Sequence, residues 1–493
     1  MNSLSHILLR QAKERPDKTA VMTADGTLSF AELEELVLRC ATLLRSQGVT
    51  QHKICGLAIS DPLCMLIAWL ALGRLRVGVI CLPPGQSQKQ AASLIKACSV
   101  GAVLSNQPGM PKRPQIIEVS LTQIKGNPLP TSENIELGSG DIEYIINGSG
   151  STGTPKLIAY QFGVATAQVT ASARAFGTQE NDVFLSYVSL NFGTPFLFCM
   201  EAFSTGAAIV MENQRGMDAF EVTERYGVTV SYATVYHAEL LLSLAHKHGR
   251  RFEKMRLFEI SASVVTDALV QRLKESLTEN VVITYDSNEC WPVTKLDTAR
   301  ENRPSGSVGR AISKAELQIV NNQDEILPAN HPGWVRMRSP GMMAGYIGDQ
   351  EGTRKVLRNG WSYPGHIGEL NEEGHLILLG RSDHMMICNG VNIYPAEIEQ
   401  IMADHPAVKD VAVMPMQHSI HQDIPICAVA LHADQTEVEA ELLAYGRKRL
   451  GGKAPPAVFI VDNIPRNQLG KLVRKEMAAI LSERVKKYQQ AVV

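Results

Sequence analysis

A loop of small and hydroxylated residues follows an apolar run and ends at a lysine, in the sequence YIINGSGSTGTPKLIAY at residues 144–160. Glycines let backbone amides approach an anion closely, hydroxyl groups donate hydrogen bonds, and an ammonium group adds positive charge. These residue types together suit a polyphosphate. The candidate phosphate-binding residues are Gly148, Ser149, Gly150, Ser151, Thr152, Gly153, Thr154 and Lys156. A polar surface turn is the other interpretation of the same composition.

Two familiar phosphate-binding motifs share part of this spacing. Three glycines of the loop are spaced as in the dinucleotide fingerprint, but that fingerprint needs a helix directly after the third glycine and an acidic residue about 20 residues further on. Here Pro155 follows, the next residues indicate a strand, and the first acidic residue is Glu180. A Walker loop requires Gly-Lys-Ser/Thr in direct succession, whereas Gly153 is followed by Thr154 and Pro155. Both motifs are therefore excluded, and a nicotinamide oxidoreductase loses its main support.

Patterns of helix and strand alternate before residue 304, which is typical of α/β layers. The expected helices are 63–72, 88–97, 220–226 and 268–276, and the expected strands are 77–82, 101–104, 228–232 and 281–285. From 304 to 347 the short apolar runs are broken by Gly, Pro and Asn, which indicates an antiparallel β region. The sequence therefore predicts an α/β fold in which strand ends carry the loop described above.

A smaller α+β unit is expected after Asp383. Its predicted helices are 396–402 and 437–450, and its predicted strands are 408–414, 426–431 and 458–461.

Composition and charge exclude several classes of protein. The chain of 493 residues has a formal net charge of −2, so no electrostatic footprint for nucleic acid is present. Its longest apolar run, residues 63–72, is too short to span a bilayer, and the N-terminal residues lack a signal-peptide core. Nine cysteines without a CxxC pair suit reduced core thiols. We therefore expect a cytoplasmic protein without a membrane or nucleic-acid partner.

The phosphate-binding loop resembles that of the adenylate-forming superfamily, which includes acyl-CoA synthetases, the adenylation domains of peptide synthetases, and firefly luciferase. Further segments resemble the family's motifs in the family's order. These are YDSNE at 285–289, GWSYPGHIGEL at 360–370, GRSDHMM at 380–386, NGVNIYPAEIE at 389–399 and PRNQLGKLVRKEM at 465–477. Because they span most of the chain, we identify it as a diverged member of this superfamily.

The resemblance implies a large N-terminal domain at 1–382 and a small mobile lid at 383–493, with its hinge at Asp383. It also implies the reaction and its cofactors. ATP, with Mg²⁺, is attacked by a carboxylate at the α-phosphate to give an acyl adenylate and pyrophosphate, and a thiol or an amine then displaces AMP. Charge accumulates at the α-phosphate in the transition state, so oriented cations are required.

Specific roles follow from the same resemblance. Lys471 matches the catalytic lysine, and Glu289 matches a magnesium ligand, for which a hard carboxylate is suitable. The matched nucleotide-site residues are Tyr285 against adenine, Arg381 on the ribose hydroxyls, Asn288 and His366 beside them, and the loop residues Ser149, Gly150, Ser151, Thr152, Gly153, Thr154 and Lys156, of which Thr152 also serves catalysis. Residues 389–390 match a loop on the route of the incoming thiol. A solvated lysine, an acid at a helix N-terminus and a core aromatic are the alternative interpretations of Lys471, Glu289 and Tyr285.

Several positions depart from the family pattern. The largest departure is His366, where the family has an aspartate that accepts hydrogen bonds from both ribose hydroxyls, whereas an imidazole offers at most one acceptor. Four others surround the same site, namely Asn288 and Gly148 in place of threonine, Leu157 in place of glycine, and Ile387 in place of lysine.

The acyl pocket is less clearly defined by the sequence. Residues 261–264, Ser-Ala-Ser-Val, replace a segment that is usually Gly-Gly-Ala-Pro, which narrows the expected pocket and favours a small or flat acid. Members of the family that activate amino acids carry an aspartate near the position of Asn191. The asparagine here therefore argues against an α-amino acid as the substrate. The candidate pocket walls, each equally compatible with ordinary core, are Phe192, Phe196, Tyr232 and Tyr236.

Two functions remain after this comparison. The first is an acid–thiol ligase that uses CoA or a carrier protein in trans as the acceptor. The second is a catalytically impaired nucleotide-binding protein of the same fold, suggested by His366 and the altered loop. The segment 414–431 lacks the glycine and basic residues that are frequent in CoA-using members, which slightly favours a carrier protein.

Overall fold

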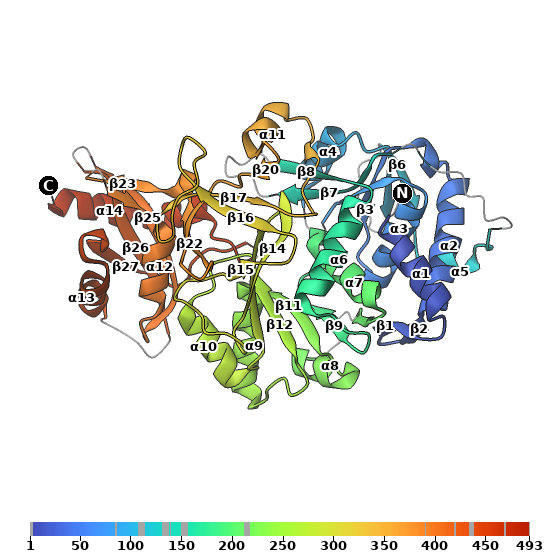
Figure 1. The fold of residues 1–493 in the computed structure, drawn as a ribbon, viewed down its shortest axis with the longest axis horizontal. Coiled ribbons are helices and arrows are strands. Elements are labelled where there is room, and N and C mark those ends of the chain that lie inside the picture. The colour runs from blue at the N-terminus through green and yellow to red at the C-terminus, as the bar shows by residue number, and fades with distance from the viewer. Residues whose placement is uncertain are drawn as a thin grey trace.

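The computed structural model describes residues 3–83, 86–106, 114–130, 138, 140–148, 156–211, 217–389, 391–418, 421–432, 438–467 and 470–492. Within these residues the chain forms four sheets, which helices separate and cover. Figure 1 shows the sheet of the C-terminal residues at one end of the molecule and the sheet that contains β3 to β8 at the other.

The largest sheet has a parallel centre. In sheet order its strands are β15 (Arg310–Ala311), β14 (Cys290–Asp297), β13 (Val281–Ser287), β12 (Leu257–Ser261), β11 (Val230–Thr234), β9 (Val183–Ser186), β10 (Ala208–Val210), β1 (Thr19–Thr23) and β2 (Gly26–Ser29). The strands from β13 to β1 run parallel to one another. Ligands of open α/β sheets bind outside the carboxyl ends of such strands, so the ends of β11, β12 and β13 mark a candidate site.

A second sheet carries the glycine-rich loop. Its strands, in sheet order, are β18 (Gly345–Tyr346), β8 (Lys156–Gln161), β7 (Ile142–Gly148), β4 (Gly78–Cys81), β3 (Ile54–Ala58), β5 (Ala102–Ser105) and β6 (Gln115–Glu118). Strand β7 is parallel to β4 and antiparallel to β8, with Gly148 opposite Lys156. The loop therefore connects two paired antiparallel strands, and the strand expected after it is confirmed.

Two helices, α6 (Val164–Phe176) and α7 (Thr194–Thr205), pack between these sheets, where a single apolar core unites side chains of both. The far face of the larger sheet is covered by α8 (Ala219–Tyr226), α9 (Val235–His248) and α10 (Asp267–Ser276). The far face of the second sheet is covered by α4 (Gln88–Ala97), whose bounds are those expected from the sequence. The remaining N-terminal helices are α1 (Ser5–Glu14), α2 (Phe30–Ser46), α3 (Pro62–Arg74) and α5 (Leu121–Gly126).

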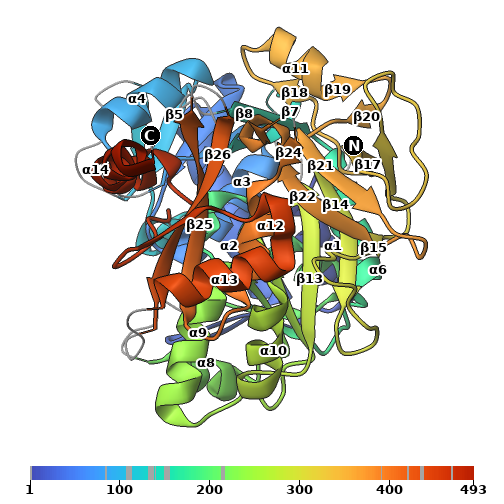
Figure 2. The ribbon, with the colours of Figure 1, turned by 90° about the vertical axis from the view of Figure 1, so that its left-hand side faces the viewer.

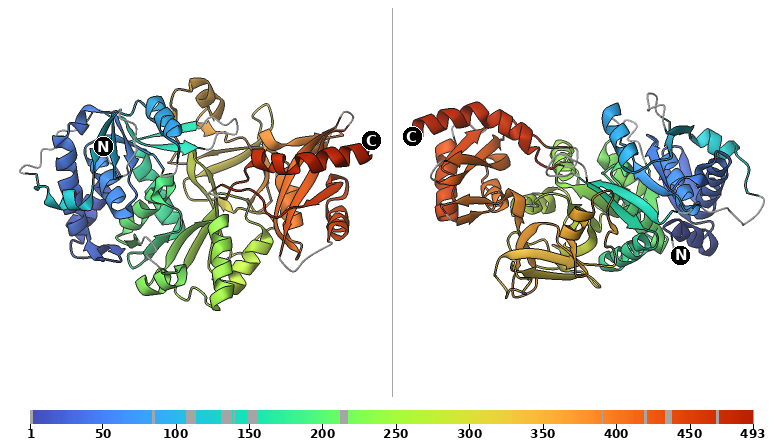
Figure 3. Two further views of the ribbon diagram at one scale, coloured as in Figure 1. Left: turned by 180° about the vertical axis from the view of Figure 1, so that it is seen from behind. Right: turned by 90° about the horizontal axis from the view of Figure 1, so that it is seen from above.

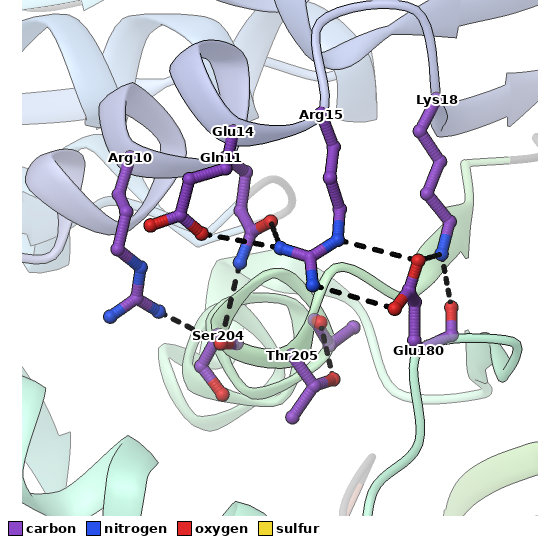
Figure 4. A network of polar contacts seen from close by, with 9 residues as sticks. Arg10, Gln11, Glu14, Arg15, Lys18, Glu180, Ser204 and Thr205 are labelled. Carbon is purple, nitrogen blue, oxygen red and sulfur yellow. Dashed lines mark hydrogen bonds and ion pairs between the residues drawn. The ribbon is translucent and has the colours of Figure 1, made fainter.

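Helix α1 is fastened to α7 and to the segment before β9 by a polar network (Figure 4). Lys18 Nζ lies 2.9 Å from the carboxylate of Glu180, and Arg15 Nε lies 3.3 Å from it. Arg10 donates to the carbonyl oxygen of Ser204, near the end of α7, at 2.8 Å. These contacts join the start of the chain to the C-terminal end of α7 and to the segment before β9.

An antiparallel sheet follows the large sheet in sequence. Its strands are β16 (Glu316–Val320), β17 (Gly333–Arg338), β19 (Leu357–Arg358), β20 (Trp361–Ser362), β21 (His366–Leu370) and β22 (Leu376–Arg381), with α11 (Gln350–Val356) before β19. Two of its strands, β16 and β17, lie in the region 304–347 where an antiparallel arrangement is expected. Its core includes the buried Tyr285 from β13, which joins the two sheets. The predicted α/β class with an antiparallel region is confirmed.

The C-terminal residues form a separate small sheet. Its strands are β23 (Met386–Cys388), β24 (Val391–Ile393), β25 (Val408–His418), β26 (Gln422–Leu431) and β27 (Ala457–Ile460). Side chains of β25 and β26 alternate between two cores, one under α12 (Pro395–Ala403) and α13 (Glu439–Leu450), the other under α14 (Arg474–Val492). Figures 2 and 3 show these helical layers on opposite sides of the sheet. A short 3₁₀ turn, Ser382–His384, precedes this region, and the domain boundary at Asp383 stays a prediction.

Candidate active site

The predicted phosphate-binding loop lies mostly outside the described residues. Ser149, Gly150, Ser151, Thr152, Gly153 and Thr154 belong to that part, so their predicted roles stay predictions. Lys156 begins β8, and its ammonium group lies 4.9 Å from the centre of the Tyr346 ring. Lys156 Nζ also donates to the hydroxyl of Tyr346 at 3.5 Å.

The same tyrosine contacts the predicted magnesium ligand. The hydroxyl of Tyr346 donates to Glu289 Oε1 at 2.6 Å, so Glu289 and Lys156 share one phenol. Among the described residues, no hydrogen bond to Glu289 Oε2 is found. In that part of the chain, no group of three or more His, Cys, Asp or Glu side chains could hold a metal ion. A single carboxylate fits Mg²⁺, which keeps several waters and binds through one or two carboxylates together with phosphate oxygens.

Tyr285 and His366 meet at the end of β13. The Tyr285 hydroxyl lies 2.7 Å from His366 Nδ1, and the two rings pack edge to face with centroids 5.4 Å apart. The pairing of β21 with β22 places His366 directly opposite Arg381. Burial, followed by repulsion from the Arg381 and Lys471 cations, lowers the pKa of His366 to about 3. The imidazole is therefore neutral at physiological pH.

Arg381 is paired with the predicted hinge residue. Its Nε donates to Asp383 Oδ1 at 2.8 Å and its Nη2 donates to Asp383 Oδ2 at 2.9 Å, a bidentate contact. Both side chains are more than one third exposed. The predicted ribose ligand and the predicted hinge are thus in direct contact.

Lys471 lies in a turn that is hydrogen-bonded to itself. The amide of Lys471 donates to Asn467 Oδ1 at 3.0 Å, and the amide of Asn467 donates to the carbonyl oxygen of Lys471 at 2.9 Å. Gly470, just before the lysine, has a φ of +76°, which glycine adopts without strain. A Cβ atom at Gly470 would lie 3.0 Å from Tyr236 Cβ on α9. The turn therefore fits closely against the large sheet's helical layer.

The ammonium group of Lys471 interacts electrostatically with residues at the end of β13. Burial, followed by repulsion from Arg381, lowers the pKa of Lys471, and the carboxylates of Asp286 and Glu289 oppose this change. The structure therefore brings the predicted catalytic lysine, the magnesium ligand and the ribose arginine into one site. Asn288, between the two acids, accepts a hydrogen bond from Tyr160 at its carbonyl oxygen, and its amide group lies beside Gly148.

Sequence reasoning did not single out two residues of this site. Asp286 is half-buried, and burial raises its pKa to about 7 against the opposing effect of Lys471. Its place inside YDSNE is the signal that could have identified it. Tyr346 lies on a strand of two residues with no local pattern, so only the tertiary structure shows that it joins Glu289 to Lys156.

The C-terminal region also contacts the start of α10. Gln400 Nε2 on α12 donates to Asp267 Oδ2 at 3.4 Å. Asp267 is held in turn by Arg303, with Nη1 2.8 Å from Oδ1, and by the hydroxyl of Ser305 at 2.6 Å. This second contact supports the orientation in which Lys471 enters the site.

The predicted acyl side is built mainly from hydroxyl groups. The hydroxyls of Tyr232 and Ser261 lie 3.2 Å apart, and Ser263 donates to the carbonyl oxygen of Gly470 at 3.4 Å. Tyr236 is 44% exposed beside them. Asn191 Nδ2 donates to Ser189 Oγ at 3.1 Å, and its Oδ1 is buried without a hydrogen-bond partner among the described residues.

Two of the candidate pocket walls have different environments. Phe196 is 1% exposed and stacks on Trp69 with ring centroids 4.0 Å apart, so it belongs to the core rather than to a pocket wall. Phe192 is half-buried in the 3₁₀ turn that precedes α7.

Comparison with known proteins identifies the class. Residues 8–347 match the model of the AMP-binding enzyme family, and residues 397–471 match that of the AMP-binding enzyme C-terminal domain. The chain belongs to the AMP-binding enzyme family. The predicted adenylate-forming superfamily and the predicted enzyme class are confirmed.

Particular relatives are ligases. A 2-succinylbenzoate–CoA ligase of Bacillus licheniformis is 27% identical over 480 residues, which cover 95% of this chain and 98% of the relative. An indoleacetate–CoA ligase of Aromatoleum aromaticum is 25% identical over 516 residues, which cover 98% of each chain. The O-succinylbenzoate CoA synthetase of Bacillus subtilis, solved with ATP and magnesium, superposes with a TM-score of 0.84 at 24% identity, covering 95% of this chain and 98% of that chain. This likeness confirms the fold.

In the part of the chain that the structure describes, helices long and apolar enough to cross a membrane are absent.

Proposed function

We propose that this protein uses ATP and Mg²⁺ to convert a carboxylic acid into an acyl adenylate and then transfers the acyl group to a thiol. In the first step a carboxylate oxygen bonds to the α-phosphorus, and pyrophosphate leaves. In the second step the thiolate sulfur bonds to the acyl carbon, and AMP leaves. The observation that carries the proposal is that Lys471, from the C-terminal region, interacts electrostatically with Asp286, Glu289 and Arg381.

Lys471 supplies positive charge where negative charge develops. A cation held in a half-buried site is worth more than in water, because little solvent screens it. Negative charge on Asp286 and Glu289 favours the charged form of the amine and opposes the effect of burial on its pKa. Arg381 adds a second cation on the nucleotide side.

Glu289 is the residue that would hold Mg²⁺. Its Oε1 accepts a hydrogen bond from the Tyr346 hydroxyl, and Oε2 would be the oxygen that binds the ion. The ion, when bound, neutralises phosphate charge. Lys156 also contacts the Tyr346 hydroxyl, at the start of β8, the strand that follows the glycine-rich loop. Its positive charge would bind the outer phosphates of ATP.

A small or flat acid fits the acyl side. The side chains of Ser261 and Ser263 occupy space where the family has glycine and alanine, and both are engaged, Ser261 with Tyr232 and Ser263 with the Lys471 turn. The two ligases named above act on 2-succinylbenzoate and indoleacetate, according to their names. Both are acids with a flat ring, which supports the same substrate class here.

The names of the relatives favour CoA as the acceptor of the acyl group. We therefore propose CoA in place of the carrier protein that segment 414–431 slightly favours. The test is incubation with ATP, Mg²⁺, a panel of small aromatic and aliphatic acids, and either CoA or a phosphopantetheinylated carrier protein, followed by mass spectrometry. We expect an acyl-CoA and AMP in equal amounts. Transfer to the carrier protein alone would refute CoA as the acceptor, and accumulation of acyl adenylate with neither would refute both.

A second candidate is a protein that binds the nucleotide without turnover. The contact that favours it is the Tyr285–His366 hydrogen bond, because it occupies one of the two imidazole nitrogens. The family's aspartate offers two oxygens to the ribose, whereas His366 keeps only one nitrogen for it. ATP binding without AMP release for any acid would support this candidate against the first.

A further inference from the structure

We propose that His366 contacts the ribose of the nucleotide as a hydrogen-bond donor through Nε2, and that the Tyr285 hydroxyl selects the tautomer which makes it a donor. The family's aspartate can only accept at this position, so the polarity of ribose recognition is reversed. The inference rests on the proposed function, with the ribose placed where the resemblance to the family implies it, beside Arg381 and residue 366.

The Tyr285–His366 contact fixes the proton on the imidazole. At 2.7 Å between the hydroxyl oxygen and Nδ1, one group donates and the other accepts. The phenol is the stronger acid of the two neutral donors, and the bare imidazole nitrogen is a better acceptor than a phenol oxygen, so the hydroxyl donates to Nδ1. We therefore assign Nδ1 as the acceptor and place the single ring proton on Nε2.

The surroundings keep the ring in its neutral form. Burial is the largest effect against a second proton, the cations of Arg381 and Lys471 and the ring of His384 add to it, and the Asp383 carboxylate opposes it. Asp383 is itself bonded by two nitrogens of Arg381 at 2.8 and 2.9 Å. A neutral imidazole with one proton is one donor and one acceptor, and the acceptor is already used.

Nε2 is the free end of this chain of contacts. His366 is half-buried at the start of β21, opposite Arg381 and beside the end of β13. Within the described residues, no hydrogen bond to Nε2 is found. An N–H group in this position needs an acceptor on the ligand, which a ribose hydroxyl oxygen supplies.

A hydrogen-bond acceptor and a hydrogen-bond donor at residue 366 tolerate different changes in the ribose. A carboxylate needs the hydrogen of a ribose hydroxyl, so replacing that hydroxyl by hydrogen or by fluorine should be equally harmful. An N–H donor needs only the oxygen's lone pair, so fluorine, a weak acceptor, should recover part of the affinity that a deoxyribose loses. The wild-type protein and the His366→Asp variant should therefore rank the same nucleotides differently.

The experiment is calorimetric titration with ATP, 2′-deoxy-ATP, 3′-deoxy-ATP and the two corresponding fluoro-deoxy nucleotides. For the wild-type protein we expect the deoxy nucleotide at the contacted position to bind about tenfold more weakly than ATP, and its fluoro analogue to recover about threefold of that loss. For His366→Asp we expect no recovery by fluorine at either position. Since fluorine alters the sugar pucker equally for both proteins, the difference between them isolates the contact.

Two tyrosine variants test the assigned tautomer. Tyr285→Phe keeps the ring but removes the hydroxyl, so the proton is no longer confined to Nε2 and the recovery by fluorine should shrink. Tyr187→Phe is the matched control, because its hydroxyl contacts Thr223 at 3.3 Å elsewhere in the large domain. This control should rank the nucleotides as the wild-type protein does.

The outcomes distinguish failure of the donor assignment from failure of the proposed ligase activity. Equal ranking in the wild-type protein and His366→Asp would overturn the donor assignment, even if pyrophosphate exchange proceeds normally. The expected ranking without exchange for any acid would support the assignment and overturn the proposed ligase activity. Failure to bind ATP would overturn both.

Discussion

The nucleotide side and the acyl side of the site differ in how they treat charge. On the nucleotide side, cations face carboxylates, as in the Arg381–Asp383 pair and in Lys471 beside Glu289. On the acyl side, hydroxyl groups face each other or a buried carboxyl group, as in Tyr232 with Ser261 and Thr284 with Glu259, where the latter contact is 3.0 Å long.

This difference separates chemistry from selection. Groups that stabilise developing charge must remain ionised, and opposite charges nearby secure this in a half-buried site. Groups that only shape a pocket can be neutral. Changes on the nucleotide side should therefore alter rates strongly, whereas changes on the acyl side should alter stability or the choice of acid.

The largest effect is expected from Lys471→Ala. This change removes the cation that faces the α-phosphate, so adenylation measured by pyrophosphate exchange should fall by roughly 10²-fold or more. Thioester formation from preformed acyl adenylate should change far less, because no pyrophosphate leaves in that step. Lys475→Ala, an exposed lysine of the same region, is the control and should retain full exchange. Normal exchange in Lys471→Ala would remove this lysine from the catalytic site.

Glu289→Gln tests the metal on the same side. An amide oxygen is a weaker ligand for a hard cation, so the Mg²⁺ concentration that gives half-maximal exchange should rise by about tenfold. Tyr346→Phe leaves the carboxylate in place and removes only the hydrogen bond that orients Oε1, so its shift should be smaller. Superimposable Mg²⁺ titrations of Glu289→Gln and wild type would assign Glu289 to structure alone.

Glu259→Gln tests the buried carboxyl beneath the acyl side. Burial, followed by repulsion from Glu201, raises the pKa of Glu259 from 4.5 to about 8. A group with a higher pKa in the folded chain holds its proton there while the unfolded chain releases it, so the free energy of unfolding falls as pH rises from about 4.5 towards about 8.

The Gln variant cannot ionise and should lose this part of the pH dependence. We compare the free energy of unfolding of the two proteins by urea unfolding. The value for Glu259→Gln minus the value for wild type should increase by on the order of 1 kcal/mol or more between about pH 5 and about pH 8. Parallel pH profiles for the two proteins would show that Glu259 is not protonated in the folded state.

The smallest effect is expected from Ser261→Gly. The change removes the hydroxyl that meets Tyr232 and widens the acyl side, so the KM for the preferred acid should rise by about threefold while the KM for ATP stays the same. Larger flat acids should become better substrates in the same steady-state assay. An equal rise in both KM values would show that the two sides are not independent.

The sequence predicts the elements well where one pattern decides them. Helix α4 has the expected bounds, and the apolar run at 63–72 lies inside α3, because buried helices of this length leave a continuous apolar signal. Phe196 was compatible with a pocket wall or with core, and only its stacking on Trp69 decides for core. An isolated aromatic residue carries no pattern that distinguishes these two positions.

Within the site, the motifs indicate residues but not their partners. The segments around Tyr285, Glu289, Arg381 and Lys471 are recognisable because each keeps its local residue types. The Tyr285–His366 bond and the Arg381–Asp383 pair join side chains whose contacts depend on strand pairing and on the orientation of the C-terminal region. Local sequence does not encode that geometry, so the contacts had to be observed.

The most direct test of the central claim is the exchange of labelled pyrophosphate into ATP by the wild-type protein, with and without each acid of the panel. Exchange reports formation of the acyl adenylate and its reversal, and it needs no thiol acceptor. We predict exchange that depends on the acid and on Mg²⁺ and that is strongest with a small or flat acid. Absence of exchange with every acid, in a protein that binds ATP, would contradict the account.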